Sequence, residues 1–210
     1  MTAPGTFLLS DNPMGSVARE LEPVTIAEFD DYVERQGDDS CLFELLDGVI
    51  VMMPEPTLRH AHMVGNFGAP LKLATDRRGG DTFLSGLRVQ RDGDERKLNK
   101  PRPDVIVRLG PSNRETDLLT YVDDPVVVIE VLRPTSIDIV RGRKLVFYQS
   151  LETLQHIVIV YQNQMRIEHT RRGADGWTMT ALTKPEHVLD LDAVAFTMTA
   201  EEAYLGVDID

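Results

Sequence analysis

The sequence predicts a mixed α/β fold built around one central sheet. Residues 126–132 read VVVIEVL, an almost uninterrupted apolar run rich in β-branched side chains, which is typical of a strand buried on both faces. Segments with helical apolar spacing stand before and after this run in the chain. Helices alternating with strands in this way indicate a sheet covered by helices.

The N-terminal part predicts an arm, a helix and a hairpin. Residues 1–22 are rich in Gly, Pro and Ser and have no periodicity, so we expect a flexible arm, followed by a single domain over 23–210. Thr25 with Glu28 three residues later forms a capping-box pattern, which predicts a helix up to Gly37. Asp47-Gly48 between CLFELL and VIVMM predicts a tight hairpin.

A second helix is expected over 57–76. One stripe at helical spacing joins His60, Val64, Phe67 and Leu71, and Pro70 predicts a kink. The remaining expected elements are strands over 82–91, 103–109, 125–132, 155–161, 165–170 and 177–182, helices over 136–150 and 199–204, and a polar loop over 92–102.

Composition bounds the class of protein. The single cysteine, Cys41, excludes an intramolecular disulfide framework. We see neither a secretory signal nor an apolar run long enough for a membrane, so we expect a cytoplasmic protein without a membrane partner. The net charge is −12, yet residues 58–184 carry 20 bases and 15 acids, a net of +5. A basic middle is compatible with binding phosphates, although ordinary solvated surface explains such charges equally well.

Glu130 is the most informative residue. It lies within the apolar central strand, where an ionised carboxylate is costly unless a cation or hydrogen-bond donors compensate it. A basic side chain or a divalent metal ion would satisfy this need. Asp104 begins the preceding strand, so both acids would point into one site if the two strands are adjacent. Hard cations such as Mg²⁺ take carboxylate oxygens and keep several waters.

Lys144 is the expected cationic partner. It falls in the apolar stripe of the helix that follows Glu130. A crossover helix returns over its own sheet, and Lys144 lies roughly 12 Å along that helix. Glu130 lies roughly 7 Å before the strand end, which leaves about 5 Å for the lysine stem to span. An amine that reaches the surrounding water is the alternative.

An ordered set of motifs runs through residues 24–172: FELLDGVIVMMPEPTLRH, PDVIV, VIEVLRPTS, RGRKLVFY and SLETLQHIVIVYQ. Together these segments resemble the Uma-two family of endonucleases, in the PD-(D/E)XK superfamily. The resemblance implies a restriction endonuclease-like core, with a central mixed sheet flanked by helices and catalytic acids on adjacent strands.

The resemblance also assigns residues. Glu44 matches the early acidic position, Asp104 the aspartate of the PD motif and Glu130 the acid of the third motif. Leu132 stands where the superfamily usually has lysine, and Lys144 matches a lysine displaced to the next helix, with Tyr148 packing beside it. Two further positions depart from the family pattern: Val49 and Val140 stand where relatives commonly have acidic residues.

The expected activity is metal-dependent hydrolysis of phosphodiesters in nucleic acid, DNA in the first instance. Asp104, Glu130, Glu44 and a carbonyl at Val131 would bind Mg²⁺ or Mn²⁺, with Lys144 as the catalytic cation. Candidate nucleic-acid contacts are His60, Arg88, Arg91, Arg96, Lys97, Lys100 and Arg102. Analogy with nucleases that cut both strands suggests a homodimer. The alternatives are a binding or assembly module without catalysis and a hydrolase of small phosphoesters.

Overall fold

The computed structural model describes residues 22–37, 43–53, 55–91, 98–110, 119–132 and 140–209. By its internal contacts the chain divides into two compact units, residues 1–55 with 92–101 and residues 56–91 with 102–210. The expected limits of the arm and of a single domain stay predictions.

The first unit contains one helix and one hairpin. Helix α1 (Ile26–Gln36) begins at the N-cap Thr25 with the expected capping box. Strands β1 (Phe43–Leu46) and β2 (Val49–Met52) pair antiparallel around Asp47 and Gly48, which both have positive φ angles. Positive φ at both central positions is the requirement of a type I′ turn, so the predicted hairpin is confirmed.

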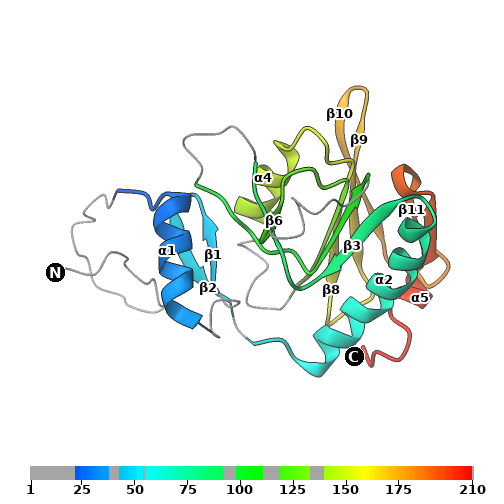
Figure 1. The fold of residues 1–210 in the computed structure, drawn as a ribbon. Helices are drawn as coiled ribbons and strands as arrows, with labels where there is room; N and C mark the ends of the chain where they lie inside the picture. The colour runs from blue at the N-terminus through cyan, green and yellow to red at the C-terminus, as the bar shows by residue number, and fades with distance from the viewer. Residues whose placement is uncertain are drawn as a thin grey trace. The chain divides into compact units, whose positions relative to one another are not determined.

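The second unit is built on a mixed six-stranded sheet in the order β10-β9-β8-β7-β5-β3 (Figure 1). The neighbours β7 and β8 are parallel and the other pairs are antiparallel. The strands are β3 (Gly80–Leu84), β5 (Val105–Leu109), β7 (Val127–Leu132), β8 (His156–Tyr161), β9 (Ile167–Gly173) and β10 (Gly176–Leu182).

Helices cover both faces of this sheet (Figure 1). Helix α2 (Leu58–Asp76) buries the predicted stripe against the face that carries Val105, Ile129 and Val158. On the other face, helix α4 (Leu145–Gln149) packs Phe147 and Tyr148 against Val128 and Ile159. The mixed α/β fold expected from the sequence is confirmed.

The C-terminal segment adds to the α2 side. Strands β11 (Val188–Leu191) and β12 (Phe196–Thr199) form an antiparallel hairpin and are joined by a short 3-10 turn, Asp192–Val194. Helix α5 (Ala200–Ala203) follows directly and is capped by Thr199. Sequence reasoning anticipated the terminal helix but not the hairpin.

Two other expectations were wrong in detail. The strand expected over 82–91 is broken at Ser85, whose φ angle is +44°, and resumes as β4 (Arg88–Val89), which pairs with β6 (Tyr121–Val122). The helix expected over 136–150 is a π-helical turn, Val140–Lys144, followed by α4; residues 133–139 lie outside the described residues.

Close packing explains one glycine of α2. A Cβ atom placed on Gly68 would lie 2.3 Å from a methyl carbon of Leu84 on β3. A larger residue at position 68 would require the Leu84 side chain to move, and the same helix carries His60 to the candidate site.

Candidate active site

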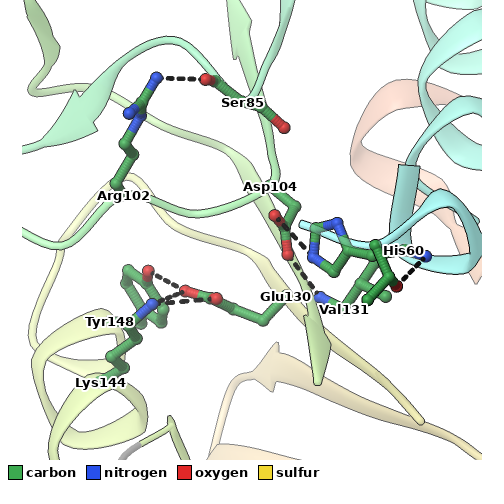
Figure 2. Close-up of polar contacts among 9 residues, drawn as sticks. His60, Ser85, Arg102, Asp104, Glu130, Val131, Lys144 and Tyr148 are labelled. Atoms are coloured by element: carbon green, nitrogen blue, oxygen red, sulfur yellow. Dashed lines mark hydrogen bonds and ion pairs between the residues drawn. The ribbon is translucent and has the colours of Figure 1, made fainter. Parts of the chain in front are cut away.

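The acid of the central strand is buried and has a cationic partner. Glu130 is 5% exposed, and every residue of β7 is buried. The Lys144 amine, itself 1% exposed, donates to both carboxylate oxygens of Glu130 at 3.0 Å. The Tyr148 hydroxyl donates to Oε1 of the same carboxylate at 2.5 Å. Figure 2 shows both side chains converging on Glu130 from the helical segment that follows β7.

The local sequence explains this convergence. The chain leaves β7, returns by α4 and enters β8 parallel to β7, which places the helix over the strand it has left. Lys144 and Tyr148 are four residues apart, so they lie on one side of the helical segment. A buried carboxylate that receives an amine and a hydroxyl meets the requirement set by its burial.

Asp104 lies directly before β5, next to Glu130. Because Val105 pairs with Ile129 in the antiparallel ladder, Asp104 stands opposite Glu130. Its Oδ2 accepts a hydrogen bond from the Val131 amide at 2.7 Å, and its Oδ1 lies 3.2 Å from Nε2 of His60.

The two acids take their partners from different sides of the sheet. His60 belongs to α2, whereas Lys144 and Tyr148 belong to the segment on the α4 side. Figure 2 shows the Asp104 carboxylate between His60 and Val131, and Glu130 directed toward Lys144. Strand alternation predicted that the side chains of Asp104 and Glu130 point to one face of the sheet, and these contacts do not show that arrangement. Asp104 precedes β5, so its side-chain direction is not fixed by the alternation of the strand.

The donor chemistry fits a hydrated hard cation. Within the described residues each Asp104 oxygen has one protein partner, so a lone pair remains on each. Mg²⁺ often takes only one or two carboxylates and keeps its waters. Among the described residues no group of three or more His, Cys, Asp or Glu side chains is spaced for a metal ion, so a closed protein cage is absent there. A cation shared by both acids requires a change of partner at one of them.

Other predicted site residues have different surroundings. Glu44 is buried in β1 of the first unit, and its part in the site stays a prediction. Lys100, expected on a polar loop, is 2% exposed and its amine binds both oxygens of Asp30 at 2.7 and 2.8 Å. Arg88 is also buried, while Arg91 is exposed.

The remaining candidates are placed as follows. Arg102 donates to the carbonyl of Ser85, whose amide in turn donates to the carbonyl of Asp104 (Figure 2). Arg96 and Lys97 lie outside the described residues. Their roles, like those of Arg88, Arg91 and Lys100, stay predictions.

Sequence reasoning missed the role of two residues. It placed Tyr148 beside Lys144 but did not expect its hydroxyl on Glu130. It named His60 as a nucleic-acid contact or supporting donor without a partner, and the structure places it on Asp104. The spacing of Tyr148 four residues after Lys144 was the available signal for the first; no signal in the sequence joins His60 to Asp104.

Comparison with known proteins places this site in a family. The family model Uma2, described as "Putative restriction endonuclease", matches residues 27–201, most of the chain. The chain belongs to the Uma2 family. Within this family match lie Asp104, Glu130, Lys144 and Tyr148.

Two further comparisons, one with a curated protein and one with a solved structure, also gave matches. The uncharacterised protein sll1609 of Synechocystis sp. is 24% identical over 153 residues, which cover 72% of this chain and 85% of that protein. A crystal structure from Anabaena variabilis, described as a "putative nuclease belonging to DUF820", superposes with a TM-score of 0.69 at 15% identity, covering 87% of this chain and 98% of the other. That likeness supports the fold. In the described residues no helix has the length and apolar character needed to cross a membrane.

Proposed function

We propose that this Uma2 protein is a metal-dependent endonuclease that hydrolyses phosphodiester bonds in nucleic acid, DNA in the first instance. The observation that carries the proposal is the buried Glu130 carboxylate with Lys144 and Tyr148 on it, in the strand next to Asp104. The family match, whose description names an endonuclease, supports the same reaction class.

The protein's own residues would hold the reacting groups in fixed positions. Asp104 and Glu130, with the Val131 carbonyl as a further candidate, would bind Mg²⁺ or Mn²⁺. Such an ion, when bound, polarises a phosphate and lowers the pKa of water. The Val131 amide and His60 orient Asp104, while Lys144 and Tyr148 orient Glu130.

Lys144 also places a positive charge beside the carboxylate. When water attacks phosphorus, the bond from phosphorus to the leaving oxygen breaks, and negative charge builds up on the phosphoryl oxygens. A fixed cation in a site that excludes water stabilises that charge more than in bulk solvent. Lys144 is the described cation in contact with Glu130, so we assign it this role.

Cleavage of a supercoiled plasmid with Mg²⁺ or Mn²⁺, and with excess EDTA, tests the proposal. We expect nicked and linear products with metal only, and loss of activity in Glu130→Gln and Lys144→Met. Glu152→Gln is the matched control because Glu152 is exposed. Circular dichroism would verify that each variant is folded. Metal-independent cutting, or full activity in both site variants, contradicts the proposal.

One observation favours a second function, a nuclease-fold binding or assembly module. Glu130 is already neutralised by Lys144, and Asp104 is bound to the Val131 amide and to His60 of α2. Isothermal titration with Mn²⁺ separates the two: heat of binding that disappears in Asp104→Asn supports the enzyme, and no binding at millimolar Mn²⁺ supports the module.

A further inference from the structure

The turn between β8 and β9 follows the C-terminal end of β8, and Glu130 lies near the same end of the parallel neighbour β7. Leu132 pairs with Tyr161, and the Tyr161 amide donates to the carbonyl of Arg166 at 3.1 Å. Two residues earlier on β7 and β8, Glu130 pairs with Ile159, and Ile159 in turn pairs with Glu168 on β9. Directly opposed side chains of neighbouring strands share a face.

That shared face is the one covered by α4. Ile159 and Tyr161 pack in the same cluster as Tyr148, so Glu168 and Arg166 project on the side where Glu130 meets Lys144. Two strand spacings separate β9 from β7, about 10 Å. Neighbouring phosphates of one DNA strand are closer together than this, so a strand cleaved at Glu130 carries further phosphates within reach of β9.

Arg166 is held in place by a buried acid. Its Nε and Nη2 atoms donate to Oε1 of Glu168 at 2.9 and 2.7 Å, and the guanidinium lies 5.5 Å from the centre of the Tyr161 ring. The Tyr161 hydroxyl donates to the same Glu168 oxygen at 3.1 Å. The side chain of Glu168 is 4% exposed, and that of Arg166 is 33% exposed.

The backbone of Arg166 is fixed as well. The Tyr204 hydroxyl accepts from the Arg166 amide at 3.1 Å and lies within donating distance of the carbonyls of Arg166 and Tyr161, at 2.9 and 2.7 Å. One side chain from α5's C-cap therefore sets the position of the turn. An arginine held so firmly loses little conformational entropy when it binds a ligand.

One end of this guanidinium remains for a ligand. Both bonds to Glu168 use Nε and Nη2, so Nη1 lies outside this ion pair, and the Arg166 side chain is 33% exposed. If Arg166 served only to neutralise Glu168, its guanidinium could be buried with that acid. It is instead partly exposed, on a backbone that is fixed by Tyr204. Guanidinium groups suit phosphate oxygens in geometry and charge.

We propose that Arg166 binds a backbone phosphate of the nucleic acid close to the scissile bond, and that Glu168 and Tyr161 orient it. The inference rests on the proposed function, because it takes the Glu130 site as the place of cleavage. Arg166 then sets where the strand lies on the sheet and does not take part in the chemical step.

Salt dependence of DNA binding tests this contact. The probe is a fluorescein-labelled 20-base-pair duplex, followed by anisotropy with Ca²⁺ in place of Mg²⁺ between 50 and 300 mM salt. Loss of one phosphate contact reduces the slope of log K against log salt by about 0.9. We expect this reduction in Arg166→Gln.

Two further variants make the comparison sharp. Arg171→Gln is the matched control, because Arg171 is also paired with one carboxylate, Asp192, but lies at the opposite end of β9. The double variant Arg166→Gln/Glu168→Gln keeps the wild-type net charge and leaves no buried acid without its partner. We expect it to lose the same slope as Arg166→Gln, and Arg171→Gln to keep the wild-type slope.

The outcomes separate the two proposals. Wild-type binding with an unchanged slope in both Arg166 variants overturns the phosphate contact and leaves the endonuclease proposal intact. Equal losses in Arg166→Gln and Arg171→Gln also overturn it, because they indicate a general charge effect. Absence of salt-dependent duplex binding by the wild-type protein overturns both.

Discussion

Replacement of Lys144 by methionine should expose the energetic role of the buried pair. Lys144 and Glu130 are 1% and 5% exposed, and the amine donates to both carboxylate oxygens. Methionine is similar in length and apolar, so the packing beside Phe147 and Tyr148 changes little. What remains is a buried carboxylate with the Tyr148 hydroxyl as its described donor from α4.

We expect Lys144→Met to lower the free energy of unfolding by a large amount. Removing one partner of a buried ion pair destabilises a protein by about 3–5 kcal/mol. For a chain of this size each kcal/mol lowers the melting temperature by about 2–4 °C, so Lys144→Met should melt about 6–20 °C below wild type. The double variant Lys144→Met/Glu130→Gln removes both charges of this buried pair and should recover most of this loss.

Urea unfolding followed by circular dichroism measures the four proteins of the cycle. If the two single losses simply add in the double variant, or if Lys144→Met unfolds at the wild-type urea concentration, the pairing argument is refuted. Mn²⁺ provides a second readout, since a cation bound at Glu130 would replace the missing amine. At 100 times its Kd, a ligand that binds only the folded state adds about 2.7 kcal/mol.

Three other outcomes follow from the same structure. Tyr148→Phe should lose about 1.5–3 kcal/mol of unfolding free energy, because its hydroxyl bonds a charged acceptor; an unchanged urea midpoint would contradict this. His60→Ala should lower cleavage or Mn²⁺ affinity about 10–100-fold through loss of support for Asp104, whereas His62→Ala, exposed on the same helix, should not. Burial and the neighbouring His169 lower the pKa of His156 to about 4. Since the unfolded chain then binds more protons than the folded one, stability should fall as pH decreases from about 6.5 to 4, by up to about 1.4 kcal/mol per pH unit for one proton. His156→Gln should flatten this dependence, and a pH profile identical to wild type would refute it.

The sequence predicted the centre of the fold well, because strong local patterns coincide with the tertiary contacts there. Residues Val127–Leu132 are buried because β5 and β8 flank this strand and helices α2 and α4 pack on its two faces. The hairpin at Asp47-Gly48 and the helix from Thr25 depend on local turn and cap chemistry, which the sequence contains.

The sequence-based predictions failed at segments whose structure depends on tertiary contacts. Alternation predicted a continuous strand through Ser85, but the Ser85 amide bonds the Asp104 carbonyl and the chain turns. The hairpin of β11 and β12 consists of two strands of only four residues each, and it buries Leu189, Leu191 and Phe196 in the large core. Such burial is invisible without the rest of the fold.

The site shows the same division. Burial alone predicts that the Glu130 carboxylate needs a cationic partner or hydrogen-bond donors. The geometry of the following helix is enough to predict that the Lys144 amine reaches this carboxylate. The partners of the Asp104 side chain could not be derived, because Asp104 lies one residue outside the regular ladder. Its partners come from β7 and from His60 of α2, which is distant in the sequence.

The placement of Lys144 has a consequence for how the protein folds. Glu130 enters the sheet on β7, whereas the groups that neutralise it arrive only with the next segment of chain. A sheet that closes before α4 docks must enclose a bare charge or take up a proton. The strand, its crossover helix and β8 should therefore assemble in one cooperative step, and substitutions at Lys144 should slow refolding as well as weaken the native state.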